Sequence, residues 1–209
     1  MSFDHLFKVI IFGGGGVGKT SLINRYVDNT FFANVPQTVG VDFKAKDISV
    51  TNEIIRLQLW DTAGQDDFRL PFTSSIYKGA QGIVIVFDLT SEDTIRDVQS
   101  FLKEIDDHCI EDVVIVLAGN KSDLSNQVEY KSIIDEITKK KEYPIFLTSA
   151  LKGTNVEEMF EHLAKELLEK QAQSNITRQM DAIMNPTPPP ENIVKPEIPT
   201  NKNPKKGCC

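Results

Sequence analysis

Short apolar runs rich in valine and isoleucine alternate with polar segments along most of the chain. Each run precedes a polar or glycine-containing turn and then, in most cases, a sequence with helical periodicity. Strands that alternate with helices are typical of a parallel α/β sheet that is covered on both faces. We therefore expect an α/β fold. The runs that we interpret as its strands are LFKVIIF, IIRLQLW, GIVIVFD, VVIVLAG and YPIFLTS.

A different pattern occurs in residues 41–50, VDFKAKDISV, where apolar and polar residues alternate. The short turn TNE separates this segment from IIRLQLW, so the pair predicts a hairpin that adds one antiparallel edge strand. Further along, apolar residues recur with helical spacing and predict one buried helix face. These residues are Val156, Met159, Phe160, Leu163 and Leu167.

Composition narrows the class of protein. The 209 residues are 40% hydrophobic and 25% charged, which fits one globular domain with some chain left over. The net charge of -7 argues against nucleic acid as a partner. The three cysteines form neither a disulfide framework nor a Cys-x-x-Cys metal pair. The apolar runs are far shorter than the roughly 18 residues that span a bilayer, and the N-terminus has no cleavable signal pattern, so we expect a cytosolic chain.

The glycine-rich stretch FGGGGVGKTS, residues 12–21, is compatible with two motifs. As G-x-G-x-x-G it would belong to a dinucleotide-dependent redox enzyme, and as G-x-x-x-x-G-K-[ST] it would be the phosphate loop of a nucleoside triphosphatase. Only the second motif gives Lys19 and Thr20 a task. Lys19 would neutralise the β and γ phosphate oxygens, the Thr20 hydroxyl would ligate Mg²⁺, and backbone N–H groups from Gly15 onward would wrap the phosphates. We therefore favour the phosphate loop.

Three later segments supply the rest of a nucleotide site. In WDTAGQ, Asp61 would hold Mg²⁺ through water, the Gly64 N–H would reach a γ-phosphate, and Gln65 would orient the attacking water. In NKSD, the Asp123 carboxylate would accept from N1–H and the 2-amino group of guanine, and would be left unpaired against adenine. In TSA, the Ala150 N–H would reach guanine O6. These segments favour guanine and argue against a small-molecule kinase with the same phosphate loop.

With these motifs, residues 6–170, about four fifths of the chain, resemble a small GTPase of the Ras superfamily, and more specifically of the Rab family. The resemblance implies a small GTPase domain over residues 1–170 with the P-loop small G-protein fold, a six-stranded mixed sheet with five helices. It also implies an Mg²⁺-dependent switch that hydrolyses GTP to GDP and regulates vesicle-mediated transport of membrane and protein. The motifs that support the Rab assignment are TVGVDF, RLQLWDTAGQ, FR, TSSIYKGAQG and IVIVFDLT.

The resemblance gives roles to segments whose periodicity is uninformative. Residues 29–40 would form the first switch, in which Thr38 ligates Mg²⁺ and Phe31 packs on the guanine edge, and the second switch would begin at Thr62. The implied metal ligands are Thr20, Thr38 and Asp61, and the implied catalytic residue is Gln65. The implied nucleotide-binding residues are Gly15, Gly16, Val17, Gly18, Lys19, Thr20, Ser21, Phe31, Thr38, Gly64, Asn120, Lys121, Asp123, Ser149, Ala150 and Leu151.

Some positions depart from the family pattern. The second switch is one residue longer than usual, with LPF at residues 70–72 where the family tends to have two residues. Asp66 and Asp67 replace a usual Glu-Arg, and Leu151 stands where the family has lysine. A GTP-bound scaffold that hydrolyses slowly, with an altered second switch, is therefore an alternative function.

The last segment, residues 171–209, holds seven of the ten prolines and predicts a disordered, hypervariable tail. It ends in Cys208 and Cys209, a pair that is geranylgeranylated in many Rab proteins, and two lipid chains anchor firmly where one is marginal. We therefore expect a monomer that cycles between the cytosol and the cytoplasmic face of intracellular membranes. The implied partners are effector proteins, an exchange factor, a GTPase-activating protein, a prenylation escort and a GDP-dissociation inhibitor.

Overall fold

The computed structural model describes residues 2–64, 76–108, 113–138 and 141–184. Six strands form one sheet in the order β2-β3-β1-β4-β5-β6. The parallel strands are β1 (His5–Phe12), β3 (Glu53–Thr62), β4 (Gly82–Asp88), β5 (Val114–Asn120) and β6 (Ile145–Leu147). Strand β2 (Val41–Val50) lies at one edge and is antiparallel to β3. The expected mixed sheet with one antiparallel edge strand is therefore confirmed.

The hairpin between β2 and β3 follows from its turn. Val50 pairs with Glu53, so the turn contains only Thr51 and Asn52. Both have positive φ, 49° and 70°, and this backbone twist matches the twist of the two strands in a two-residue hairpin.

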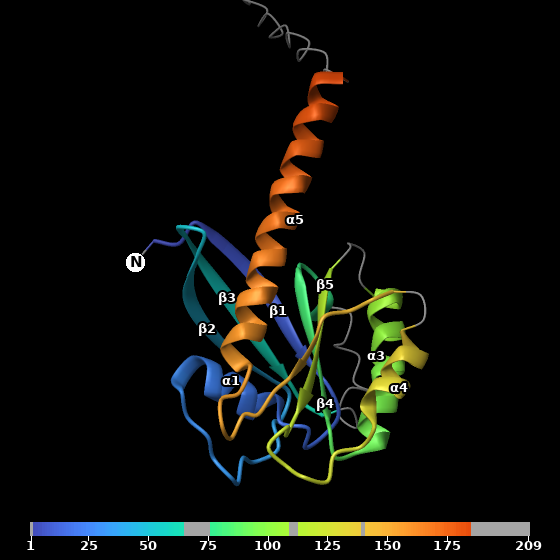
Figure 1. The fold of residues 1–209 in the computed structure, drawn as a ribbon. Helices are drawn as coiled ribbons and strands as arrows, with labels where there is room; N and C mark the ends of the chain where they lie inside the picture. Colours follow the sequence, from blue (N-terminus) through green and yellow to red (C-terminus); the bar gives the residue numbers. More distant parts are fainter. Residues whose placement is uncertain (1, 65–75, 109–112, 139–140, 185–209) are drawn as a thin grey trace, which may run out of the picture. The chain divides into compact units, whose positions relative to one another are not determined.

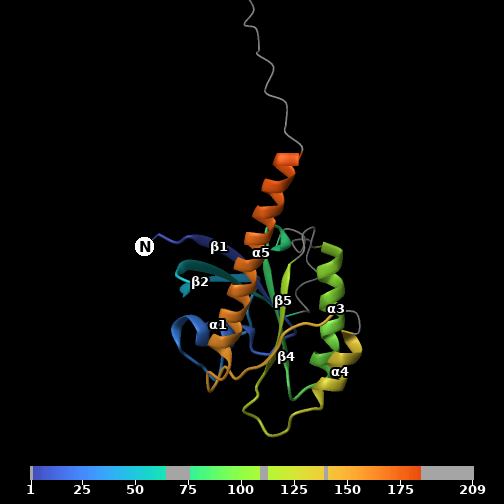
Figure 2. The same cartoon turned by 45° about the horizontal axis from the view of Figure 1, so that its top comes forward.

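Four helices lie within the described ranges, namely α1 (Lys19–Asp28), α3 (Glu92–His108), α4 (Tyr130–Ile137) and α5 (Val156–Met184). We expected five, and residues 65–75, between β3 and β4, fall outside these ranges. Helix α1 and the first part of α5 cover one face of the sheet, and α3 and α4 cover the other (Figure 1, Figure 2). Among the described helices, none is both long enough and apolar enough to cross a membrane.

The central strand β1 shows how the sequence produces two cores. Alternate side chains of a strand point to opposite faces. Phe7, Val9 and Ile11 accordingly pack with α1 and α5, whereas Ile10 and Phe12 pack with α3 and α4. None of the five is more than 1% exposed. The face predicted for the last helix is also buried, because Val156, Met159, Phe160, Leu163 and Leu167 are at most 2% exposed.

Helix α5 continues further than the sequence led us to expect. We predicted that the folded domain ends at residue 170 and that residues 171–209 are disordered, but residues 171–184 are helical. This stretch is rich in glutamine, alanine and methionine, which favour helix, and the first proline of the tail follows at residue 186. The compact body extends to Ala172. The rest of the predicted tail, with both terminal cysteines, lies outside the described residues.

Candidate functional site

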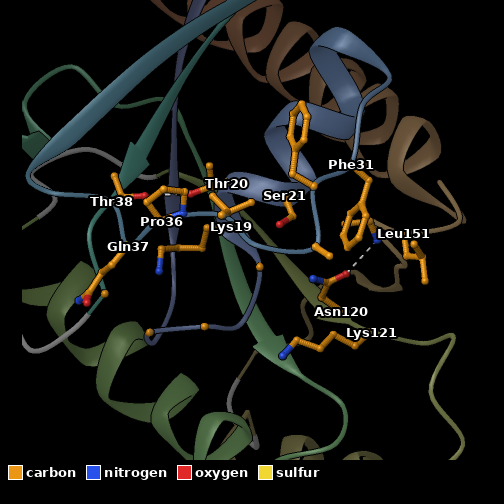
Figure 3. Close-up of a pocket in the computed structure, with 18 of the residues that line it drawn as sticks. Lys19, Thr20, Ser21, Phe31, Pro36, Gln37, Thr38, Asn120, Lys121 and Leu151 are labelled. Atoms are coloured by element: carbon orange, nitrogen blue, oxygen red, sulfur yellow. Dashed lines mark hydrogen bonds between the residues drawn. The ribbon is translucent and has the colours of Figure 1, made fainter.

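The loops that follow β1, β3, β5 and β6, together with the segment between α1 and β2, surround a cavity of about 730 Å³. Because these strands are parallel, their carboxyl ends meet at one edge of the sheet, which is where open α/β sheets bind ligands. The volume is within the usual range for small-molecule and cofactor sites. Figure 3 shows Lys19, Thr20 and Thr38 toward one end of this cavity and Phe31, Leu151 and Asn120 toward the other.

Most of the predicted nucleotide-binding residues line the cavity. They are Gly15, Gly16, Gly18, Lys19, Thr20, Ser21, Phe31, Thr38, Gly64, Asn120, Lys121, Asp123, Ala150 and Leu151. Val17 and Ser149 are buried behind the wall, at 1% and 0% exposure. Gln65 falls outside the described residues. The cavity also has lining residues that we did not predict, namely Phe32, Ala33, Val35, Pro36, Gln37, Thr62 and Leu124.

The phosphate loop leads directly into α1. Gly18 is the N-terminal cap of the helix and has a φ of 98°, a backbone conformation that residues other than glycine rarely adopt. A Cβ atom at this position would clash with Asn120 Nδ2. Glycine is therefore required here both by the backbone conformation and by the close approach of a second loop.

Lys19, the first residue of α1, turns its side chain back over the loop. Its ammonium donates hydrogen bonds to the carbonyl oxygens of Gly13 and Gly14, each at 2.8 Å, and the residue is only 6% exposed. Burial lowers the pKa of Lys19 to about 8, although the charge of Asp61 acts in the opposite direction. A buried ammonium beside a helix N-terminus is suited to hold an anion such as a phosphate.

The three predicted metal ligands form one hydrogen-bonded cluster. Thr20 Oγ1 donates to Asp61 Oδ2 at 2.5 Å and lies 2.9 Å from Thr38 Oγ1, which itself donates to Asp61 Oδ2 at 3.3 Å. The other oxygen, Asp61 Oδ1, is buried and has no hydrogen-bond partner. Burial raises the pKa of Asp61, against the effect of the two hydroxyls and of Lys19. Because Mg²⁺ binds hard oxygen ligands and would pair the unsatisfied carboxylate, these residues fit the metal.

Asn120 joins the two ends of the cavity. Its Nδ2 donates to the Val17 carbonyl at 2.8 Å, and its Oδ1 accepts from the Ala150 N–H at 3.2 Å, which is the dashed line in Figure 3. We predicted that the Ala150 N–H reaches guanine O6, whereas here it donates to Asn120. Asn120 is 2% exposed, so both hydrogen bonds are shielded from water. Its amide thus ties the phosphate loop to the loop after β6.

Asp123 is held in place from the loop after β6. Ser149 Oγ donates to Asp123 Oδ1 at 2.6 Å, and it accepts from the Lys152 N–H at 3.0 Å. These two bonds fix the carboxylate at the wall of the cavity. Leu151 is 49% exposed and lies near Phe31 at the same end (Figure 3). A carboxylate that is held in one orientation can recognise a planar base with two adjacent N–H donors.

Asp88, at the end of β4, does not line the cavity but contacts the lining residue Lys121, and we did not predict this role. Its Oδ2 pairs with Lys121 Nζ at 2.6 Å, and its Oδ1 accepts from the N–H and the hydroxyl of Thr90, both at 2.8 Å. Burial acts to raise the pKa of Asp88, but the hydrogen bonds from Lys121 and Thr90 outweigh it and leave the pKa below its ordinary value. Asp88 closes a buried apolar strand as Asp61 does, and this shared pattern could have identified it.

Comparison with known proteins gives one consistent result. Residues 8–169 match the Ras family. The chain is 40% identical over 176 residues to the GTP-binding protein YPT1 of Saccharomyces cerevisiae, covering 83% of this chain and 84% of that protein. It is 39% identical over 212 residues to the Ras-related protein Rab-1A of Dictyostelium discoideum, covering 99% and 98%. It is 35% identical over 208 residues to the Ras-related protein Rab11C of Lotus japonicus, covering 99% and 95%.

The fold and the cavity agree with this result, since the glycine-rich loop, an aspartate at the end of β3 and the NKSD segment after β5 lie at one edge of the sheet. The chain belongs to the Rab family of small GTPases, in the Ras superfamily, whose members bind guanine nucleotides, hydrolyse GTP and regulate vesicle transport.

Proposed function

We propose that the cavity holds GTP or GDP with the phosphates beside Lys19 and Thr20 and the guanine beside Asp123. The observation that carries this proposal is the Asp123 carboxylate, which Ser149 orients at the end of the cavity opposite the buried ammonium of Lys19. The α1 N-terminus and Lys19 attract the negative phosphates, and Asp123 pairs with the N1–H and 2-amino donors of guanine. Phe31 would pack on the edge of the base and Leu151 would cover the base, since both line the cavity.

We assign the metal and catalytic roles to the residues predicted from the sequence. Thr20, Thr38 and Asp61 would hold Mg²⁺, which when bound neutralises charge on the β and γ phosphates. The Gly64 N–H would donate to the γ-phosphate, and Gln65 would orient the attacking water. Asp61 is then ionised, since the metal supplies the counter-charge that its buried carboxylate lacks.

The switch is a consequence of where Thr38 lies. Its hydroxyl belongs to the same cluster as Thr20 and Asp61, although it comes from the segment between α1 and β2. Loss of the γ-phosphate removes a contact that orders this segment, so its conformation reports which nucleotide is bound. Effector proteins that recognise the GTP form would then act in vesicle traffic, and an exchange factor and a GTPase-activating protein would reset the cycle.

We further propose a lipid-anchored, monomeric protein. Geranylgeranyl groups on Cys208 and Cys209 would hold it at the cytoplasmic face of intracellular membranes. A prenylation escort and a GDP-dissociation inhibitor would shield these lipids while the protein is in the cytosol. Mass spectrometry of the protein from a eukaryotic host tests this, and unmodified cysteines on the membrane-bound fraction would contradict it.

The experiment that tests the base assignment is the substitution Asp123→Asn. Xanthine carries a carbonyl where guanine has its 2-amino group, so an asparagine amide pairs with xanthine and loses a bond to guanine. We expect Asp123→Asn to weaken GDP binding by on the order of 10²-fold or more and to strengthen xanthosine diphosphate binding. Asp107→Asn, on the exposed end of α3, is the matched control and should leave both affinities unchanged. Unchanged selectivity in Asp123→Asn would rule out the proposed base position.

Slow hydrolysis by a GTP-bound scaffold is not the favoured function. The extra residue in the second switch, which suggested this alternative, belongs to residues 70–72 and falls outside the described residues. Single-turnover hydrolysis by wild type and Gln65→Leu separates the two functions. A switch enzyme loses activity in Gln65→Leu, with or without an activating protein, whereas equal rates in both proteins would contradict the role of Gln65.

A further inference from the structure

Arg25, in the last turn of α1, donates hydrogen bonds to two separate loops. Its Nε donates to the Ala150 carbonyl at 2.8 Å, and its Nη2 donates to the Leu151 carbonyl at 2.9 Å. Its Nη1 donates to both Asn29 O, at 3.0 Å, and Asn29 Oδ1, at 2.9 Å. Across the described parts of the chain, no carboxylate forms an ion pair with Arg25. All three nitrogens of the guanidinium are therefore engaged by loop atoms.

One of these loops begins the first switch. Asn29 is the C-terminal cap of α1 in a left-handed conformation, with a φ of 52°, and its N–H donates to the Asn24 carbonyl. Phe31, on the wall of the cavity, follows two residues later. The bonds from Nη1 thus fix the point at which the segment that carries Phe31 and Thr38 leaves the helix.

The other loop forms the opposite wall at the base end of the cavity, which is the end beside Asp123 where we propose that the guanine binds. Ala150 and Leu151 line the cavity, and Figure 3 shows Leu151 near Phe31. Arg25 therefore connects both walls of the base end to a single helix. The other end of that helix carries Lys19 and Thr20, which contact the phosphate end of the cavity. The planar guanidinium fork is suited to this task because its donors lie in fixed directions.

We propose that Arg25 is a positioning residue that retains the nucleotide by keeping the two walls of the base end together. This inference rests on the proposed position of the guanine. Arg25 itself does not line the cavity and lies at the end of α1 remote from the phosphates. It therefore controls the rate at which GDP and GTP leave, and it does not affect the hydrolysis of GTP that is already bound.

The test compares Arg25→Gln and Arg25→Lys with the control Arg96→Gln. Arg96 is also a helical arginine, but its partner is Glu92 on the exposed face of α3. Two rates are measured, namely the release of a fluorescent GDP analogue and the single-turnover hydrolysis of preloaded GTP. We expect Arg25→Gln to release the analogue about tenfold faster, which corresponds to ~1.4 kcal/mol. Its hydrolysis rate should stay within about twofold of wild type, and Arg96→Gln should match wild type in both.

Arg25→Lys separates the fork from its charge. A lysine ammonium keeps the favourable charge at the helix C-terminus but donates from one point, so it cannot reach both loops. We expect its release rate to stay close to that of Arg25→Gln. Full restoration by lysine would overturn the proposal, as would wild-type release by Arg25→Gln or an equal change in release and hydrolysis. If wild type binds no guanine nucleotide, the proposed function fails as well, whereas normal binding with unchanged release in Arg25→Gln refutes only the role of Arg25.

Discussion

Replacing Asn120 by alanine tests the link between the phosphate loop and the loop after β6. The substitution removes the donor to the Val17 carbonyl and the acceptor of the Ala150 N–H, both of them in a buried region. A buried polar group that loses its partner costs about 1–3 kcal/mol, so the two groups together predict a loss of about 2–6 kcal/mol in the free energy of unfolding. For a chain of this size, a loss of ~3 kcal/mol lowers Tm by roughly 6–12 °C.

Thermal unfolding of the nucleotide-free protein measures this change, because bound nucleotide itself stabilises the folded state and Asn120 lines the cavity. Asn120→Asp is an informative companion, since it keeps an acceptor for Ala150 but places a carboxylate oxygen against the Val17 carbonyl. It should also be less stable than wild type. The exposed Asn126 provides the control Asn126→Ala, which should change stability by less than about 0.5 kcal/mol. A loss below about 1 kcal/mol in Asn120→Ala would refute the bridging role of Asn120.

Further predictions concern other contacts of the cavity. In Gly64→Ala the new Cβ would lie 2.7 Å from the Gly15 Cα, so the two loops must separate, and single-turnover GTP hydrolysis should fall by on the order of 10²-fold. Removing Mg²⁺ with EDTA should speed GDP release from wild type, and Asp61→Asn should already release GDP quickly and respond little to EDTA. The depressed pKa of Asp88 means that its ionised form stabilises the folded state above the ordinary pKa of 3.8 and that this stabilisation is lost as the pH falls through the lower folded-state value. Urea unfolding should therefore show Asp88→Asn to be less stable than wild type at pH 7, by a margin that narrows below pH 3.8.

The sheet could be predicted from the sequence because its strands have strong local signals. Runs such as GIVIVFD are buried on both faces and therefore apolar throughout, whereas the edge strand β2 alternates because one side of it meets solvent. The helical continuation of α5 beyond residue 170 was not predicted. Prolines dominate the composition of the tail, but a proline interrupts a helix only near its own position. The first of them is residue 186, and the residues before it favour helix.

Much of the candidate site was also predictable, because residues 13–21, 61–65, 120–123 and 148–150 keep a fixed spacing around the expected ligand. The hydrogen bonds that hold the loops of the cavity together left no such pattern in the sequence. Arg25 donates to backbone carbonyls that lie 125 and 126 residues away in the sequence. Every residue has a backbone carbonyl, so the side chains at those positions do not reveal the contact. The predicted role of Asn120 was incomplete for the same reason, since its hydrogen-bond partners here are main-chain groups of two other loops.

The central claim is that this cavity holds a guanine nucleotide. The most direct measurement denatures freshly purified protein and identifies the released nucleotide by chromatography against GDP, GTP, ATP and NAD standards. We predict close to one guanine nucleotide per chain, mostly as GDP, because an active GTPase completes its cycle during purification. Release of ATP or NAD, or of no nucleotide from folded protein, would contradict the account.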